Sequence, residues 1–177
     1  IDPDVSYQAK DTLPEGNYLT IFLEYELSQH AAEIIIRTDD TSEPDQATYA
    51  LRRLSLSRCL ANIGRPDDAL KVAEQATNHY RTLVESNPAS YTPDLATSLN
   101  TLAVYLTDNG WHHEALEASL EATDLYRDLA KHNPAAYKPN LASCLNTLAI
   151  LQAENGRKRK ALKSSRRATD LYRDLAK

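Results

Sequence analysis

The chain has 177 residues, of which 42% are apolar and 25% charged, and its formal net charge is −5 at pH 7. This composition suits one compact domain or one short repeat array, and the weak negative charge argues against nucleic acid or an anionic membrane as a partner. With four glycines and a single Phe the sequence is poor in the residues that an all-β fold needs, and no apolar run is long enough to span a bilayer.

The first quarter of the chain, residues 1–43, precedes the clearest pattern. A strongly apolar stretch over residues 18–37 predicts a helix, and Gly16 stands before it as a turn glycine would. We expect residues 1–43 to form an N-terminal cap or remnant helices, because terminal repeats are atypical. The sequence contains no Met and stops where its pattern would begin another unit, so we expect a piece of a longer protein.

From residue 44 onward, the same residue types return every forty-six positions. The recurring sets are Gly64, Gly110 and Gly156; Ala69, Ala115 and Ala161; Ala76, Ala122 and Ala168; and Tyr80, Tyr126 and Tyr172. A fixed period of this kind is the signature of a stacked repeat array. We therefore predict an all-α fold, an α-solenoid of antiparallel helix pairs, with units over residues 44–86, 87–132 and 133–177.

The middle unit is typical of the three. Pro93 suits the first turn of one helix, Gly110 ends that helix, and a second helix is predicted from about His112 to Lys131. Tyr91 is expected in the connector before the first helix, where it would fill the gap between successive pairs. Alanines that recur seven positions apart leave room for two helices to approach closely.

The run Leu-Asn-Thr-Leu-Ala at residues 99–103, the Asn-Gly at 109–110 and the Glu-Ala-Leu at 114–116 together resemble the tetratricopeptide repeat (TPR). The Pro-Asp-Leu-Ala at residues 93–96 is similar to the kinesin-light-chain-like branch, and the match returns at residues 145–149. The usual TPR period is about 34 residues, whereas the period here is 46, so the groove shape cannot be copied from the usual family. The resemblance implies a right-handed superhelix that binds protein partners.

The resemblance also implies a peptide-binding groove on the concave side, lined by the first helix of each pair. Carried over position by position, its wall contains Arg58, Thr97, Asn100, Thr101, Val104, Ser143, Asn146 and Thr147. An Asn amide suits this role because it can donate to a backbone carbonyl and accept from a backbone N–H. The alternative is that Asn100 and Asn146 satisfy each other, or a neighbouring carbonyl, between stacked helices.

A basic run follows the last turn glycine. One hypothesis is an anion site formed by Arg157, Lys158, Arg159 and Arg166. The alternative is pairing between successive second helices, because the repeat places acidic residues beside basic ones. The expected pairs are Glu114 with Lys160, Glu117 with Lys163, and Glu121 with Arg167.

The remaining candidates give little indication of chemistry. Trp111 is either a binding anchor or a cover for the seam between helices, and the cover is the favoured interpretation. His112 and His113 lack metal-ligand spacing, and no nucleophile, Walker or GxGxxG motif is present, so we expect no metal, no cofactor and no enzyme activity. Cys59 and Cys144 have no CxxC spacing and are interpreted as buried free thiols of a reducing, cytoplasmic compartment.

Two functions remain open. The first is a scaffold that binds a partner polypeptide in the concave groove, as part of a larger signalling protein. The second is an oligomerisation or regulatory segment, whose last helix stacks on further repeats or on a second copy through Leu162, Leu171, Tyr172 and Leu175.

Overall fold

The computed structural model describes residues 29, 30, 32, 34 and 46–176. Residues 46–176 form helices α3 (Gln46–Asn62), α4 (Pro66–Ser86), α5 (Pro88–Asp108), α6 (His112–His132), α7 (Pro134–Glu154) and α8 (Lys158–Leu175). The predicted apolar helix over residues 18–37 lies outside the described residues except at four positions, which are helical. The boundary proposed for the N-terminal cap, residue 43, also lies outside them.

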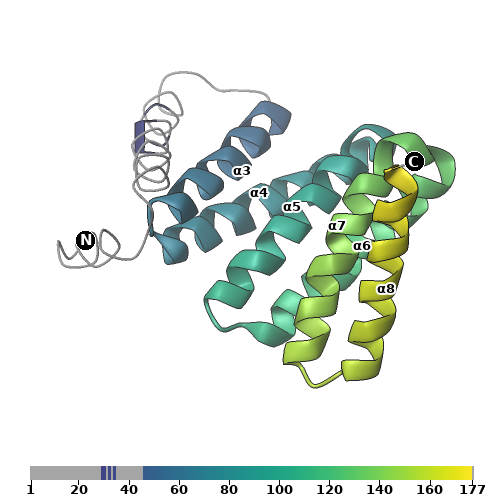
Figure 1. The fold of residues 1–177 in the computed structure, drawn as a ribbon. Helices are drawn as coiled ribbons and strands as arrows, with labels where there is room; N and C mark the ends of the chain where they lie inside the picture. Colours follow the sequence, from purple (N-terminus) through teal and green to yellow (C-terminus); the bar gives the residue numbers. More distant parts are fainter. Residues whose placement is uncertain (1–28, 31, 33, 35–45, 177) are drawn as a thin grey trace.

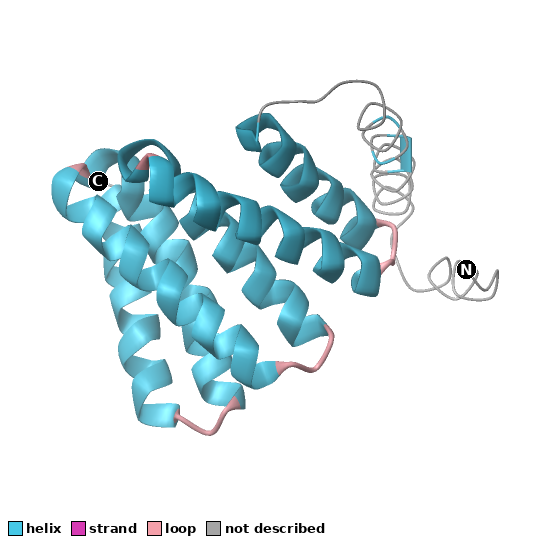
Figure 2. Cartoon of the chain, turned by 180° about the vertical axis from the view of Figure 1, so that it is seen from behind, coloured by secondary structure: helices cyan, strands magenta, loops and turns pink. Residues whose placement is uncertain are grey.

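The helices are arranged as a row of antiparallel hairpins. Extensive contacts join α3 to α4, α5 to α6 and α7 to α8 within the pairs, and α4 to α5 and α6 to α7 between them. The two opposite views of Figures 1 and 2 place α3 toward one end of this row and α8 at the other. The predicted fold class, an all-α solenoid of antiparallel helix pairs, is confirmed.

Glycine closes the turn inside each pair. Gly64, Gly110 and Gly156 have φ values of +72°, +80° and +72°, in the left-handed region that other residues rarely adopt. Their amides donate to carbonyls of the preceding helix, as in the bond from Gly110 N to Thr107 O at 2.9 Å. The three turn positions predicted from the repeat are therefore confirmed, and each reverses the chain for the same backbone reason.

The connection between pairs is shorter than expected. Helix α5 begins at Pro88, directly after Asn87, and Pro93 lies inside the helix. The Asn87 side-chain oxygen accepts from the Ser90 backbone N–H at 3.3 Å, which caps the helix five residues earlier than predicted. Tyr91 is consequently helical, and its prediction as a connector residue is wrong. It is nonetheless packed against the core between the pairs, as expected.

The core is built from alanines at the helix crossings and larger side chains beside them. Ala69, Ala76, Ala115 and Ala122 are completely buried. Tyr80, Leu99, Leu116 and Tyr126 fill the adjoining space and are at most 2% exposed. The predicted packing of small residues against large ones is confirmed, and it forms clusters that run continuously from one pair into the next.

Four hydroxyl groups in this core are satisfied within their own helices, whereas the buried Ser119 Oγ has no hydrogen-bond partner among the described residues. The hydroxyls of Ser57, Thr77, Ser98 and Thr123 donate to carbonyls three or four residues earlier, at 2.8 to 2.9 Å. Cys144 is buried and Cys59 half-buried, and both are free thiols. Burial raises the pKa of Cys144 to about 12, so this thiol is protonated at neutral pH and serves as a small core residue.

Candidate functional site

The predicted wall residues recur at matching positions of the first helices. Arg58 lies on α3; Thr97, Asn100, Thr101 and Val104 lie on α5; and Ser143, Asn146 and Thr147 lie on α7. Because α5 also contacts α7 directly, the last two groups belong to neighbouring helices. The side chains of Arg58, Thr97, Val104, Ser143 and Asn146 are exposed, and those of Asn100, Thr101 and Thr147 are half-buried.

The threonines of this wall are engaged by the protein itself. Thr97 Oγ1 donates to the Pro93 carbonyl at 3.0 Å and lies 2.6 Å from the Tyr126 hydroxyl of α6. The Asn140 side chain of α7 donates to the same hydroxyl at 3.3 Å, so this network joins three helices. Thr101 donates to the Thr97 carbonyl at 3.1 Å. These hydroxyls can still accept a hydrogen bond, but their own protons are used inside the array.

Asn100 differs from its neighbours on α5. Its side-chain oxygen Oδ1 is buried and has no hydrogen-bond partner, although the residue as a whole is half-buried. Asn146, the equivalent residue on α7, is exposed, and no hydrogen bond links the two amides in the described structure. The alternative in which the two asparagines satisfy each other is therefore wrong. An acceptor without a partner costs free energy until a donor reaches it.

Apolar side chains that the sequence interpretation missed lie on the same helices. Leu51 of α3 and Ile150 of α7 are exposed, as is Val104 of α5. The repeat relates Ile150 to Val104, and relates Leu51 to Thr97 and Ser143. The signal was therefore available, because adding one period to Val104 leads to an apolar residue at a position already predicted to be exposed. The first helices thus carry both polar and large apolar side chains.

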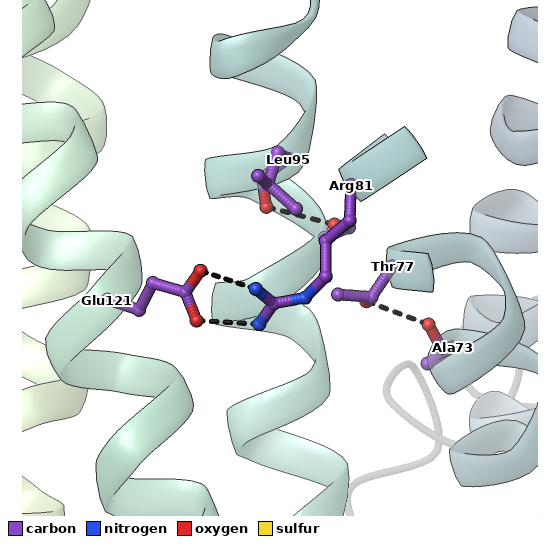
Figure 3. A network of polar contacts seen from close by, with 6 residues as sticks. Ala73, Thr77, Arg81, Leu95 and Glu121 are labelled. Atoms are coloured by element: carbon purple, nitrogen blue, oxygen red, sulfur yellow. Dashed lines mark hydrogen bonds and ion pairs between the residues drawn. The ribbon is translucent and has the colours of Figure 1, made fainter. Parts of the chain in front are cut away.

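The predicted ion pairs between successive second helices are not formed within residues 46–176. Glu121 instead binds Arg81 of α4 through two hydrogen bonds of 2.8 and 2.6 Å, which Figure 3 shows as a fork. Glu117 lies 3.7 Å from His113 of its own helix. Second helices do pair, but the contact joins residues forty apart rather than forty-six. The expectation failed because equivalent residues of two stacked helices are not directly opposite each other.

The basic residues of α8 are consequently left without acidic partners in the described structure. Arg157, Lys158, Arg159, Lys160, Lys163, Arg166 and Arg167 are all exposed. The predicted anion-binding residues therefore lie together along α8 and the turn before it. Whether they bind an anion stays a prediction.

Trp111 and the two histidines stand at the turn before α6. Trp111 is 55% exposed, and the interpretation that it covers a helix seam stays a prediction. The Nδ1 atom of His112 lies 3.9 Å from Glu154 of α7, and the His112 carbonyl accepts from Asn155 at 3.3 Å. These contacts belong to the packing of α6 against α7. Among the described residues, no three His, Cys, Asp or Glu side chains are grouped so that they could hold a metal ion.

The shifted pKa values at the core have a packing origin. Burial, with a smaller contribution from Asp94, raises the pKa of Tyr80 to about 12. Burial also raises the pKa of Tyr126, against the opposing effect of its hydrogen bonds to Thr97 and Asn140. Each phenol is held in its neutral form, which suits a structural hydrogen bond.

Within the described residues, no helix is both long enough and apolar enough to cross a membrane. No family model matches the chain, and no curated protein matches it. Similar solved structures include a putative kinesin light chain from Podosopora anserina with nearly identical TPR-like repeats, MamA, and BtubC (BKLC) from P. vanneervenii.

The extent of similarity is comparable for the three. The P. anserina protein shares 12% identity over 88% of this chain and 96% of its own, with a TM-score of 0.44. MamA shares 12% identity over 93% of this chain and 98% of its own, with a TM-score of 0.40. BtubC shares 17% identity over 91% of this chain and 82% of its own, with a TM-score of 0.37.

Proposed function

We propose that the chain is a scaffold that binds a partner polypeptide along the first helices α3, α5 and α7. The observation that carries this proposal is the buried oxygen of Asn100, which has no hydrogen-bond partner among the described residues. If the half-buried Asn100 side chain turns outward when a peptide binds, a backbone N–H of that peptide supplies the missing donor, and the amide can serve both backbone groups of a peptide unit. The repeat places a second amide, Asn146, one period further along.

Apolar contacts would supply most of the affinity. Leu51, Val104 and Ile150 are exposed on the same three helices, and a large exposed side chain gains free energy when a partner covers it. The partner we propose is therefore an extended segment with apolar side chains between accessible backbone amides. Arg58 is the only basic residue among the predicted wall positions, so the wall lacks the cluster of basic side chains that would bind a C-terminal carboxylate. The proposed partner segment therefore need not be a C-terminus.

Selection from a library of short random peptides displayed on phage tests this assignment. Peptides selected on the wild-type chain are measured by calorimetry against the double variant Asn100→Ala/Asn146→Ala. Asn78→Ala is the matched control, because Asn78 is an exposed Asn on a second helix, α4. We expect at least a tenfold loss of affinity in the double variant and none in the control. Equal affinity for all three chains would remove the groove assignment.

A second function, an oligomerisation or regulatory segment, is favoured by the exposed apolar residues of α8. Leu162, Tyr172 and Leu175 are exposed, whereas the corresponding face of α6 is covered by α7. Such a segment would act by stacking a further helix on α8.

A further inference from the structure

The last helix repeats part of an interface that is already formed elsewhere in the molecule. Residues 122–131 of α6 and residues 168–177 have the same sequence, ATDLYRDLAK. In α6, Leu116, Ser119, Thr123 and Tyr126 are at most 2% exposed. One period later, Leu162, Ser165, Thr169 and Tyr172 are all exposed on α8. These four residues of α8, spaced as one helix face, are called the open face below.

The contacts of α7 identify what covers this face in α6. Helix α7 packs along α6, and its Tyr137 ring lies 6.4 Å from the Tyr126 ring. Asn140 of α7 donates to the Tyr126 hydroxyl, and Cys144 and Leu148 are buried in the same cluster. The open face of α8 is therefore equivalent to the surface of α6 that packs against α7. The side of α7 in that contact carries a Tyr, a small residue and a Leu.

Charge distinguishes the two surfaces. Where α6 has His112, whose Nδ1 lies 3.9 Å from Glu154 of α7, α8 has Lys158. Position 154 is acidic in α7, and the equivalent residue of α5 is Asp108. Arg166 and Arg173 lie beside the open face at helical spacing, and Arg159 and Lys163 extend the basic surface. An acidic residue near the C-terminal end of an incoming helix would therefore face Lys158.

A second copy of the chain is a poor occupant of this face. The copy would have to present α3, the first helix of the first described pair. At the position of Ser98 and Cys144, both buried in their interfaces, α3 carries Arg52, so two basic surfaces would meet. Ala32 already packs in the cluster that contains Leu56 and Leu60 of α3.

We propose that the open face of α8 binds an amphipathic helix that has the side-chain pattern of α7 and an acidic residue near its C-terminal end. This proposal rests on the second function given above and names its partner class. The apolar stripe of the incoming helix packs on Leu162 and Tyr172, and its acidic end pairs with Lys158. The surrounding arginines and lysines favour acidic over basic helices by charge complementarity.

A peptide with the sequence of residues 133–155 is the direct probe, because it contains α7 with both of its ends. The substitutions Asn146→Lys and Ile150→Glu allow a lactam bridge, formed with loss of water between the new amine and carboxyl groups, that holds the peptide helical; both positions are exposed in α7. Binding to the full 177-residue chain is measured by fluorescence anisotropy. We expect saturable binding that weakens at least tenfold in Leu162→Glu and in Lys158→Glu.

Leu51→Glu is the matched control, since Leu51 is a similarly exposed leucine on α3. Leu51→Glu should leave binding of the α7 peptide unchanged and weaken binding of the peptides selected on the first helices. The assignment of the open face and the assignment of the groove can therefore fail independently. A charge swap sharpens the test further. The Glu154→Lys peptide should bind wild type weakly and recover affinity for the Lys158→Glu chain.

Three results would overturn the proposal. The first is the absence of saturable binding to the wild-type chain, and the second is binding that Leu162→Glu leaves intact. The third is a concentration-dependent dimer in sedimentation velocity that Leu162→Glu abolishes, which would assign the face to a second copy instead. Binding of wild type to vesicles of anionic lipid, with the same sensitivity to Leu162→Glu and no peptide binding, would assign it to a membrane surface.

Discussion

Helices α6 and α8 share eight consecutive residues, yet their equivalent side chains have different surroundings. Tyr126 is 2% exposed and bonded to two other helices, whereas Tyr172 is 48% exposed. Leu116 and Leu162, which each lie six residues before the shared stretch, are 2% and 53% exposed. The comparison teaches that the same local sequence is buried where a following helix pair packs against it and exposed where none does.

Truncation of the two leucines should give the largest difference between the helices. Leu116→Ala leaves a cavity in the core and is expected to cost about 2–5 kcal/mol of the free energy of unfolding. Leu162→Ala removes an exposed side chain and should cost about 0.5 kcal/mol or less. Urea unfolding followed by circular dichroism, with unchanged slopes, measures both. Equal costs would mean that the two faces are equally covered in solution.

Enlarging an alanine tests the contact inside the pair, where α6 and α8 should behave alike. Ala122 and Ala168 are 0% and 3% exposed, at the crossings with α5 and α7. Replacing either with Leu overpacks its crossing, so we expect each variant to lose about 1–3 kcal/mol and to melt at a lower temperature. An unchanged melting temperature in either variant would contradict the close approach of the paired helices.

The loss of stability at alkaline pH reports on two covered surfaces, one at Cys144 of α7 and one at Tyr80 of α4. The pKa of Cys144 rises from 9.0 to about 12 on folding, and that of Tyr80 rises from 10.0 to about 12. A raised folded-state pKa means that stability is fully present below the unfolded value and is lost as pH rises toward the folded value. Stability should therefore begin to fall above about pH 9, by at most about 1.4 kcal/mol per pH unit for each group.

Cys144→Ala separates the two groups. The variant should lose the fall in stability between pH 9 and 10 and keep the fall above pH 10, which Tyr80→Phe makes shallower while Tyr126 still contributes. Chemical unfolding at closely spaced pH values measures the slopes relative to pH 7, so the cavity left by the alanine cancels. Identical slopes in wild type and Cys144→Ala would show that the thiol is not buried at this interface.

The smallest effect concerns the ion pair between second helices. Arg81 and Glu121 are 48% and 38% exposed at their side chains, so a double-mutant cycle should give about 0–1 kcal/mol of coupling, which salt reduces. The equivalent contact between α6 and α8 would join Arg127 to Arg167, two like charges. Arg167→Glu should therefore add up to about 1 kcal/mol. A loss of stability in that variant would contradict the forty-residue register.

Much of the architecture follows from the sequence because the repeat is a packing constraint. A buried alanine at a helix crossing must return wherever the crossing returns, so Ala69, Ala115 and Ala161 predict their own burial. The turn glycines are equally predictable, since each needs a positive φ. The first residue of α5 was not predictable in this way, because Pro88 and Pro93 both suit the first turn of a helix. The hydrogen bond from the Ser90 backbone N–H to the Asn87 side-chain oxygen selects the earlier one.

The side-chain partners on the surface were harder to predict, since a period gives equivalent positions but not the offset between helices. Arg81 reaches Glu121 because two long side chains span stacked helices at a slant, and a count of forty-six could not show this. The period does not predict the exposure of Trp111 either, since burial of a side chain at a turn depends on which elements pack around that turn. Asn100 lies on the first helix that the sequence predicted for it, whereas Ile150 was missed although the period relates it to Val104.

Nitration of tyrosine tests most directly whether the neighbouring pair decides burial. The full chain is treated briefly with tetranitromethane at neutral pH, digested with trypsin and analysed by mass spectrometry, which separates the two identical stretches by their flanking residues. The account predicts rapid modification of Tyr172 and protection of Tyr126. Equal rates at the two tyrosines in the folded chain would contradict it.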